Sequence, residues 1–142
     1  MKKGILFTSL VLLASVVFTG CGCSKDGTYK FAHVEYAENG ENKQSDCSNP
    51  TGEREIEVCS VFTLIPFNEI EITLEDKAIA FTTGSNDEAE EGFYKIKDGK
   101  LLISDTEDGE YVNPFEKVNM DIRYEDKEIR IHHDFFTIVY IR

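Results

Sequence analysis

The sequence predicts an all-β domain: an eight-stranded antiparallel meander that closes, or nearly closes, into a barrel, with a long disulfide-bearing excursion between its first and second strands. From Thr28 onward, apolar and polar residues alternate with the period of two that half-buried strands show. Tight turns connect most of these segments, so successive strands are antiparallel. Closing the sheet into a barrel removes the unpaired edges that short strands would otherwise expose.

Short polar turns separate the expected strands. Glu75-Asp76-Lys77 turns the chain between two alternating segments, and Glu125-Asp126-Lys127 repeats this turn later in the chain. The pair Asp98-Gly99 supplies the positive φ that a two-residue type I′ turn needs. The eight expected strands are residues 28–36, 69–74, 78–82, 93–96, 101–103, 118–124, 129–131 and 135–141.

The inward face of these strands is uncharged and mostly bulky, so we expect a filled core rather than an open apolar cavity. If the interior were open, Phe81, Tyr94, Met120 and Tyr124 would line it, because aromatic walls and a thioether suit an apolar ligand. The expected inward residues are Phe31, Ile70, Ile72, Leu74, Ile79, Phe81, Tyr94, Ile96, Leu101, Ile103, Val118, Met120, Ile122, Tyr124, Ile129, Ile131, Phe136, Ile138 and Tyr140.

The N-terminus has the order of a secretory signal: Lys2 and Lys3, an apolar run from Ile5 to Phe18, and then small residues. Phe18-Thr19-Gly20-Cys21 resembles the lipobox of bacterial lipoproteins, whose cysteine is acylated, with palmitate for example, and becomes the new N-terminus. This resemblance implies a signal peptide at residues 1–20, a short tether at 21–27 that carries the lipidated Cys21, and a barrel at 28–142. The domain is then expected at the extracytoplasmic face of the cell membrane, held to the bilayer by Cys21.

The excursion, residues 37–66, is long enough to cross the mouth of a barrel, and its second half is either a short helix or another strand. With Cys21 acylated, three thiols remain in an oxidising setting. Cys47 and Cys59 close the shortest polar loop and are the favoured pair. Pairings that use Cys23 are the alternative.

Three features together resemble the lipocalin-like domains of small bacterial lipoproteins. They are Gly27-Thr28-Tyr29 at the start of the first strand, the repeated hairpins around the segment 92–101, and the terminal segment 136–140. The resemblance spans residues 27–142 and implies a calyx, although many members of that family have no assigned ligand.

The charge of the chain argues against nucleic acid as a partner. The net charge is −12, and without the leader, which has two basic residues and no acidic one, it becomes −14. Such a field repels nucleic acid and anionic headgroups. A solvated acidic surface is the simplest interpretation, with a cationic partner as the functional one.

The sequence indicates no catalytic machinery, so we predict no enzyme and no catalytic, cofactor-binding or metal-binding residue. It contains neither a Gly-rich phosphate loop nor a Gly-x-Ser-x-Gly elbow. His132-His133-Asp134 is interpreted as a polar turn; a metal site that adds His33 is the alternative. The acidic stretches at 86–91 and 105–110 lack the EF-hand pattern and are expected to be solvated turns.

The expected function is that of a non-enzymatic binding module, anchored in the bacterial cell envelope, for a small apolar ligand or an envelope protein. The alternative is an inhibitor or interaction protein. It would use its acidic surface or the Cys47–Cys59 loop against a basic partner such as a cell-wall hydrolase.

Overall fold

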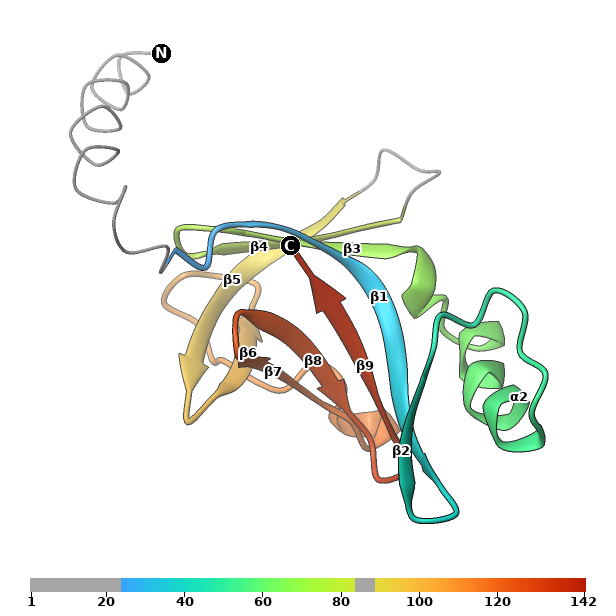
Figure 1. Cartoon of the computed structure of the whole chain (residues 1–142). Helices are drawn as coiled ribbons and strands as arrows, with labels where there is room; N and C mark the ends of the chain where they lie inside the picture. Colours follow the sequence, from blue (N-terminus) through green and yellow to red (C-terminus); the bar gives the residue numbers. More distant parts are fainter. Residues whose placement is uncertain (1–23, 84–88) are drawn as a thin grey trace.

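The computed structural model describes residues 24–83 and 89–142. The expected leader, Cys21, Cys23 and part of the acidic stretch at 86–91 lie outside the described residues. Nine strands form one antiparallel sheet in the order β2-β1-β3-β4-β5-β6-β7-β8-β9, and β1 also pairs with β9 (Figure 1). The strands are β1 (Gly27–Glu38), β2 (Glu41–Ser45), β3 (Ile70–Glu75), β4 (Ala78–Thr83), β5 (Ala89–Lys97), β6 (Lys100–Ser104), β7 (Asp121–Glu125), β8 (Glu128–His132) and β9 (Phe136–Ile141).

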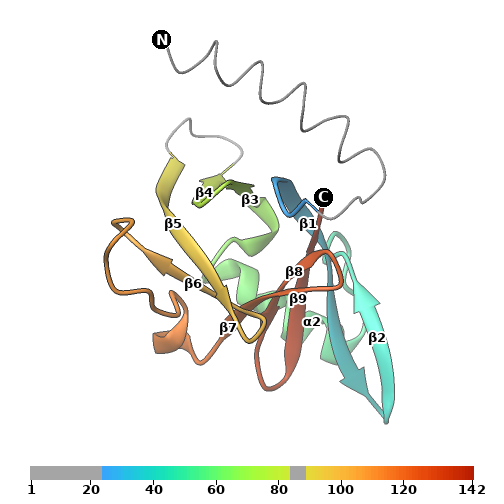
Figure 2. The same cartoon turned by 90° about the vertical axis from the view of Figure 1, so that its left-hand side faces the viewer.

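The pairing of β1 with β9 closes eight of these strands into a barrel, which confirms the predicted fold class. β2 is an additional strand that pairs only with β1 and lies beside its second half (Figure 2). Because successive strands run in opposite directions, the turns between them lie alternately at the two ends of the barrel. One end, called here the near end, has the start of β1, the end of β9 and the turns after β3, β5 and β7. The end of β1, the start of β3 and the turn between β8 and β9 lie at the other, called the far end.

Positive φ angles in the hairpin turns agree with the sequence signals. Asp98 and Gly99 have φ angles of 53° and 78°, as a type I′ turn requires. Asn39 and Gly40, at 54° and 79°, make the same turn between β1 and β2. The sequence interpretation missed β2, although the Asn-Gly pair is a strong hairpin signal.

A bulge in β1 lets this long strand serve three partners. Its first residues pair with β3, its second half pairs with β2, and residues 30–36 pair with β9 along the opposite edge. The register with β9 shifts between Phe31 and His33. One extra residue in a strand switches the sheet face to which every later side chain points. Val34 and Tyr36, which follow the bulge, therefore point inward.

The core contains most of the residues expected there. Ile72, Leu74, Ile79, Leu101 and Ile138 are fully or almost fully buried. Val118 was wrongly predicted as an inward strand residue: it belongs to the 3₁₀ turn η3 (Glu116–Val118) and is 42% exposed. Asn119 follows in the left-handed conformation, with φ 55°, and β7 begins only at Asp121.

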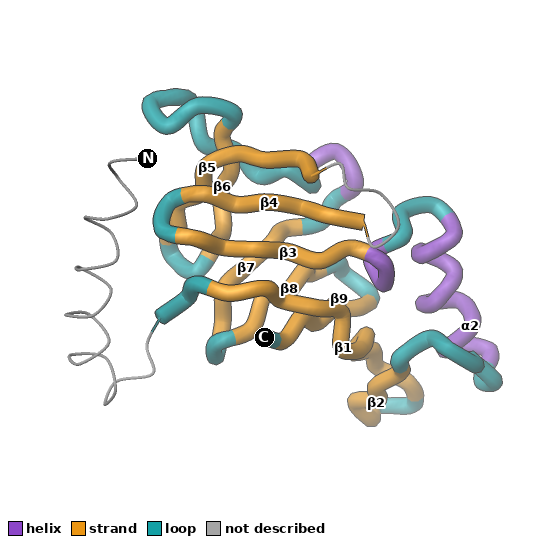
Figure 3. Tube along the Cα trace, turned by 90° about the horizontal axis from the view of Figure 1, so that it is seen from above, coloured by secondary structure: helices purple, strands orange, loops and turns teal. Residues whose placement is uncertain are grey.

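The excursion is helical, which settles the alternative that the sequence left open. It contains α2 (Glu53–Cys59), the 3₁₀ turns η1 (Ser60–Thr63) and η2 (Phe67–Glu69), and no strand after β2. Figure 3 shows α2 beyond the far end of the barrel, opposite the start of β1. No helix within residues 24–83 and 89–142 is long and apolar enough to cross a membrane.

Two interactions brace α2 against the end of β2. Cys47 and Cys59 form the expected disulfide, with their Cα atoms 5.5 Å apart. The Glu55 carboxylate accepts hydrogen bonds from the Ser45 hydroxyl at 2.5 Å and from the Thr51 amide at 3.0 Å. These bonds hold the pKa of Glu55 below its ordinary value.

Loss of the disulfide is expected to lower the free energy of unfolding by about 3 kcal/mol, because the bridge restricts the unfolded chain. The loop that it closes has a sequence separation of 12 residues. Urea unfolding of the wild type with and without reductant, and of the double variant Cys47→Ser, Cys59→Ser, measures this. An unchanged midpoint on reduction would contradict the prediction.

Candidate functional site

Aromatic side chains from the excursion close the far mouth of the barrel. The Phe62 ring packs edge-on against Phe31, with centroids 5.3 Å apart, and Phe67 packs against Phe115 at 5.6 Å. The buried Tyr140 hydroxyl donates a 2.6 Å hydrogen bond to the Phe67 carbonyl. The segment between β2 and β3 therefore belongs to the core and lies in the mouth that a ligand would use.

The near mouth is closed by tyrosines and by the residues that precede β1. Tyr29 and Tyr124 pack edge to face with ring centroids 6.2 Å apart. The Tyr29 hydroxyl donates a 2.6 Å hydrogen bond to the Lys25 carbonyl, and the Lys25 ammonium lies 5.6 Å from the centre of the Tyr124 ring. Burial and the hydrogen bond with Tyr124 raise the pKa of Tyr29.

The four expected ligand-lining residues all lie in the hydrophobic core or pack against it. Phe81, Tyr94 and Tyr124 lie on β4, β5 and β7, half-buried against the core. Met120 is 7% exposed, precedes β7, and its carbonyl accepts a 2.7 Å hydrogen bond from the Asn113 amide. Their role toward a ligand stays a prediction.

Three hollows in the described surface have volumes that a small molecule could use. The first, of about 400 Å³, lies over β3, β4 and β5 and includes Thr73, Glu75, Ala80, Glu91 and Phe93. The second, of about 490 Å³, lies over β1, β2 and the start of β9 and includes Glu35, Asn42, Gln44, Asp134 and Phe135. The third, of about 270 Å³, includes Asn113, Asn119, Asp121, His132 and Asp134. The second and third are lined mainly by polar groups and suit polar ligands, whereas the first is mainly apolar with carboxylates at its border.

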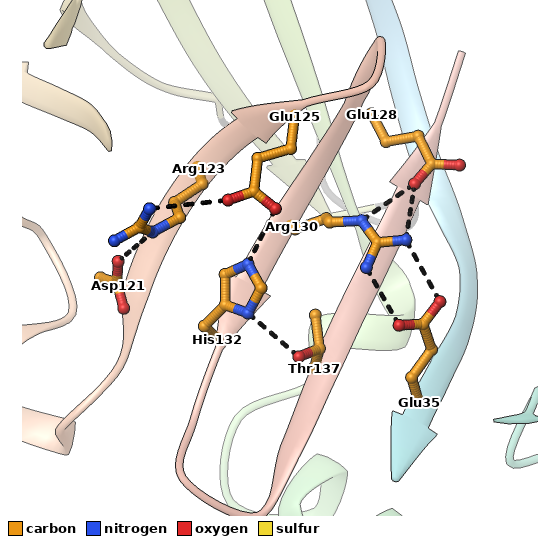
Figure 4. Close-up of polar contacts among 8 residues, drawn as sticks. All are labelled: Glu35, Asp121, Arg123, Glu125, Glu128, Arg130, His132 and Thr137. Atoms are coloured by element: carbon orange, nitrogen blue, oxygen red, sulfur yellow. Dashed lines mark hydrogen bonds and ion pairs between the residues drawn. The ribbon is translucent and has the colours of Figure 1, made fainter. Parts of the chain in front are cut away.

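The outer face of β1, β7, β8 and β9 carries a polar ladder, defined as Glu35, Asp121, Arg123, Glu125, Glu128, Arg130, His132 and Thr137 (Figure 4). Arg130 donates two hydrogen bonds to Glu35, at 3.0 and 3.2 Å, and another to Glu128 at 3.0 Å. Arg123 donates to Asp121 at 2.7 Å. Because each guanidinium is paired with carboxylates on its own or a nearby strand, the ladder joins strands and offsets part of the negative charge on this face.

Ionisation within the ladder reflects these bonds. Burial alone would raise the pKa of Glu35, but hydrogen bonds from Arg130 and His33 outweigh it and lower the pKa below its ordinary value of 4.5. Burial opposes the charge of Arg130, yet its bonds to Glu35 and Glu128 raise the pKa of the guanidinium. Both groups are therefore charged near neutral pH.

The three histidines have separate partners. His33 lies 3.2 Å from Glu35, and His132 lies 3.3 Å from Glu125 and 3.1 Å from the Thr137 hydroxyl. The His133 ring stacks on Phe136, with centroids 4.7 Å apart. Among the residues that the structure describes, no group of three His, Cys, Asp or Glu could hold a metal ion.

Exposed apolar side chains gather at the far end. Leu64 is 84% exposed, Phe135 63%, Ile56 51% and Val118 42%. We call these four residues the far rim patch. Alternation in residues 135–141 could not reveal it, because Phe135 falls in the turn before β9 rather than in the strand.

Contacts link the segment that carries Phe135 to α2 and to the segment that carries Val118. The Arg54 guanidinium, at the start of α2, lies 5.8 Å from the centre of the Phe135 ring. The Asn119 amide, next to Val118, donates a 3.2 Å hydrogen bond to Asp134, which precedes Phe135. The helical excursion, the β8–β9 turn and η3 therefore adjoin one another at this rim.

Comparison with known proteins gives little further guidance. No family model matches the chain. No curated protein matches it. A crystal structure of a DUF4847 family protein from Bacteroides vulgatus ATCC 8482 is similar over 90% of this chain and 96% of that chain, with 12% sequence identity and a TM-score of 0.45.

Replacement of the plug residue Phe67 by alanine is expected to lower the free energy of unfolding by about 3–5 kcal/mol, because it empties part of a packed mouth. Phe67 is 1% exposed, whereas Leu64 in the same excursion is 84% exposed and provides a matched control. Leu64→Ala should change stability by less than about 0.5 kcal/mol. Equal, small losses for the two variants in urea unfolding would contradict a plugged mouth.

The Glu35–Arg130 pair is expected to contribute about 1 kcal/mol of coupling near neutral pH. Because the folded pKa of Glu35 is lowered below 4.5, its stabilisation is present above that value and is lost as the pH falls through the folded pKa. A double-mutant cycle with Glu35→Gln and Arg130→Gln, repeated down the acid range, measures the coupling. A coupling energy that does not change with pH would contradict this assignment.

Proposed function

We propose that this chain is a lipid-anchored protein of the bacterial cell envelope whose barrel binds another envelope protein and catalyses no reaction. The observation that carries the proposal is the occupied interior: Phe62 and Phe67 pack in the far mouth, and Tyr29 and Tyr124 pack in the near one. A barrel filled by its own side chains leaves its outer surface for recognition.

An apolar carrier receives less support from the same geometry. Pockets for small apolar molecules are concave and lined mostly by apolar side chains, typically about 300–1,000 Å³ in volume. Of the described hollows of this size, the one of about 490 Å³ is mainly polar and contains Glu35 and Asp134, whereas the one of about 400 Å³ is mainly apolar but has Glu75 and Glu91 in its lining. Binding of a protein surface, which is polar at its rim, suits these features better.

The position of the expected lipid supports recognition at the far end. The described chain begins at Ser24, at the near end, so only residues 21–23 would separate the acyl group from the folded domain. Three extended residues span about 10 Å at most. The near end would then stay close to the bilayer, with α2 and the far rim patch facing away from it.

Labelling with radioactive palmitate in the host tests the anchor. Wild type and Cys23→Ser should carry the label and sediment with membranes, whereas Cys21→Ser should lose both properties, because only Cys21 follows the lipobox-like segment. Equal labelling of the two variants, or retention of residues 1–20 in the mature mass, would contradict the anchor.

Titration with a fluorescent fatty-acid analogue tests the occupied interior. The wild type should take up no dye, whereas Phe62→Ala should bind it, because that change empties the space beside Phe31. Native mass spectrometry of protein purified from its host should show no bound lipid beyond the acyl anchor. Stoichiometric uptake by the wild type would favour a carrier over the proposed function.

A further inference from the structure

We infer that the far rim patch docks onto a basic protein surface, in which apolar side chains are surrounded by Lys and Arg. This inference rests on the proposed function and names the chemistry of its partner. It is carried by the exposure of the patch, by the sign of the charges around it, by the rigidity of its support and by its position at the end of the barrel opposite the start of β1.

The helical excursion presents apolar side chains where a helix normally has polar ones. Val58 and Cys59 face the barrel and are at most 8% exposed. Ile56, on α2, and Leu64, just after η1, are more than half exposed. A surface helix ordinarily turns only its polar face to water, and large apolar groups exposed together are typical of interaction sites.

Carboxylates surround these apolar groups. Asp46, Glu53, Glu57, Glu116 and Asp134 are all exposed and lie on the segments that form or flank the patch. Of the cations in the same region, Arg54 donates a 2.5 Å hydrogen bond to Glu57 and Lys43 bonds to Glu38, while the exposed Lys117 lies beside Val118 and is outnumbered by the carboxylates. The local field is therefore negative, which favours a basic partner and disfavours anionic lipid or an acidic protein.

The patch is held in one conformation before a partner arrives. The Cys47–Cys59 disulfide and the Glu55 carboxylate fix α2 to β2, and Phe62 and Phe67 fix the following turns to the core. A preorganised surface loses little conformational entropy when it binds a partner. This rigidity suits a docking surface better than a flexible lid.

Hydrogen bonds at the near end fix the point at which the chain enters the barrel. The Arg142 guanidinium donates hydrogen bonds to the carbonyls of Ser24, at 2.7 Å, and Asp26, at 2.9 Å. The Asp76 amide donates to the Asp26 carboxylate at 3.1 Å. Gly27, with φ +145°, permits this closure, since a Cβ there would lie 2.5 Å from Arg142 Cδ. The chain therefore leaves the barrel at a fixed point opposite the patch.

Site-specific photo-crosslinking in the host cell tests the inference on the full, lipidated protein. A photoreactive residue replaces either Leu64 or Ile141, which is also exposed and apolar but lies at the near end. Position 64 should give discrete adducts whose crosslinked peptides are rich in Lys and Arg, and position 141 should not. Absence of adducts at 64, equal adducts at both positions, or crosslinked peptides that are acidic would overturn the inference.

Affinity measurements with the crosslinked partner, purified, separate the apolar and charged contributions. Leu64→Ser and Phe135→Ser should each weaken binding about tenfold or more, as loss of an exposed anchor does at an interface. Glu53→Gln with Glu57→Gln should slow association and reduce its salt dependence. Ile141→Ser should bind like the wild type, and circular dichroism should show all variants folded. Unchanged affinity in the far rim variants would overturn the inference.

The outcomes distinguish this inference from the proposed function. Crosslinks from a residue on the barrel wall, such as Thr82, with none from position 64, would overturn the far rim as the docking surface and leave a protein-binding function standing. A bound apolar ligand and no protein adduct from any of these positions would overturn both.

Discussion

Closure of the sheet by the β1–β9 pairing is the constraint on which the rest of the structure depends. Residues 30–36 of β1 pair with β9, while the start of the same strand pairs with β3. Without this pairing β1 and β9 would have free edges, and the apolar faces of eight strands would lack a common interior. β1 pairs with β3 along its first residues and with β2 along its second half. The bulge between Phe31 and His33 lies between these two parts, and it keeps the apolar side chains of the second half on the inner face of the closed barrel.

Closure also fixes the volume that side chains must fill, and the chain fills it from both ends. An eight-stranded barrel has an interior that its own side chains can just occupy. Here the excursion supplies Phe62 and Phe67 at the far mouth, while Tyr29 and Tyr124 pack at the near mouth. The same excursion that plugs the barrel also exposes Ile56 and Leu64. The same segment therefore fills the interior, where a ligand would bind, and exposes apolar side chains at the far rim, where a protein could bind.

Local patterns predicted the strands because alternation and turn geometry are properties of neighbouring residues. Asp98-Gly99 has the backbone angles that its sequence indicates, and the shortest polar loop between cysteines is the one that is bridged. Two errors were local: the Asn39-Gly40 turn before β2 was overlooked, and a strand was started too early. The alternating pattern predicted a strand that begins at Val118. In the structure Asn119 has a left-handed conformation, which the pattern does not reveal, and the strand begins after it. The polar ladder and the far rim patch follow from strand register and from the docking of α2, neither of which a single segment encodes.

Native-state hydrogen exchange on the full-length protein, resolved to single amides, tests barrel closure most directly. Closure predicts that the hydrogen-bonded amides of β1 residues 30–36 and of β9 exchange only by global unfolding, with the same free energy as the buried strands β3 and β8. Exchange of β1 and β9 at a much lower free energy than β3 and β8, under conditions where the protein stays folded, would contradict a closed barrel and, with it, the filled interior and the far rim that depend on closure.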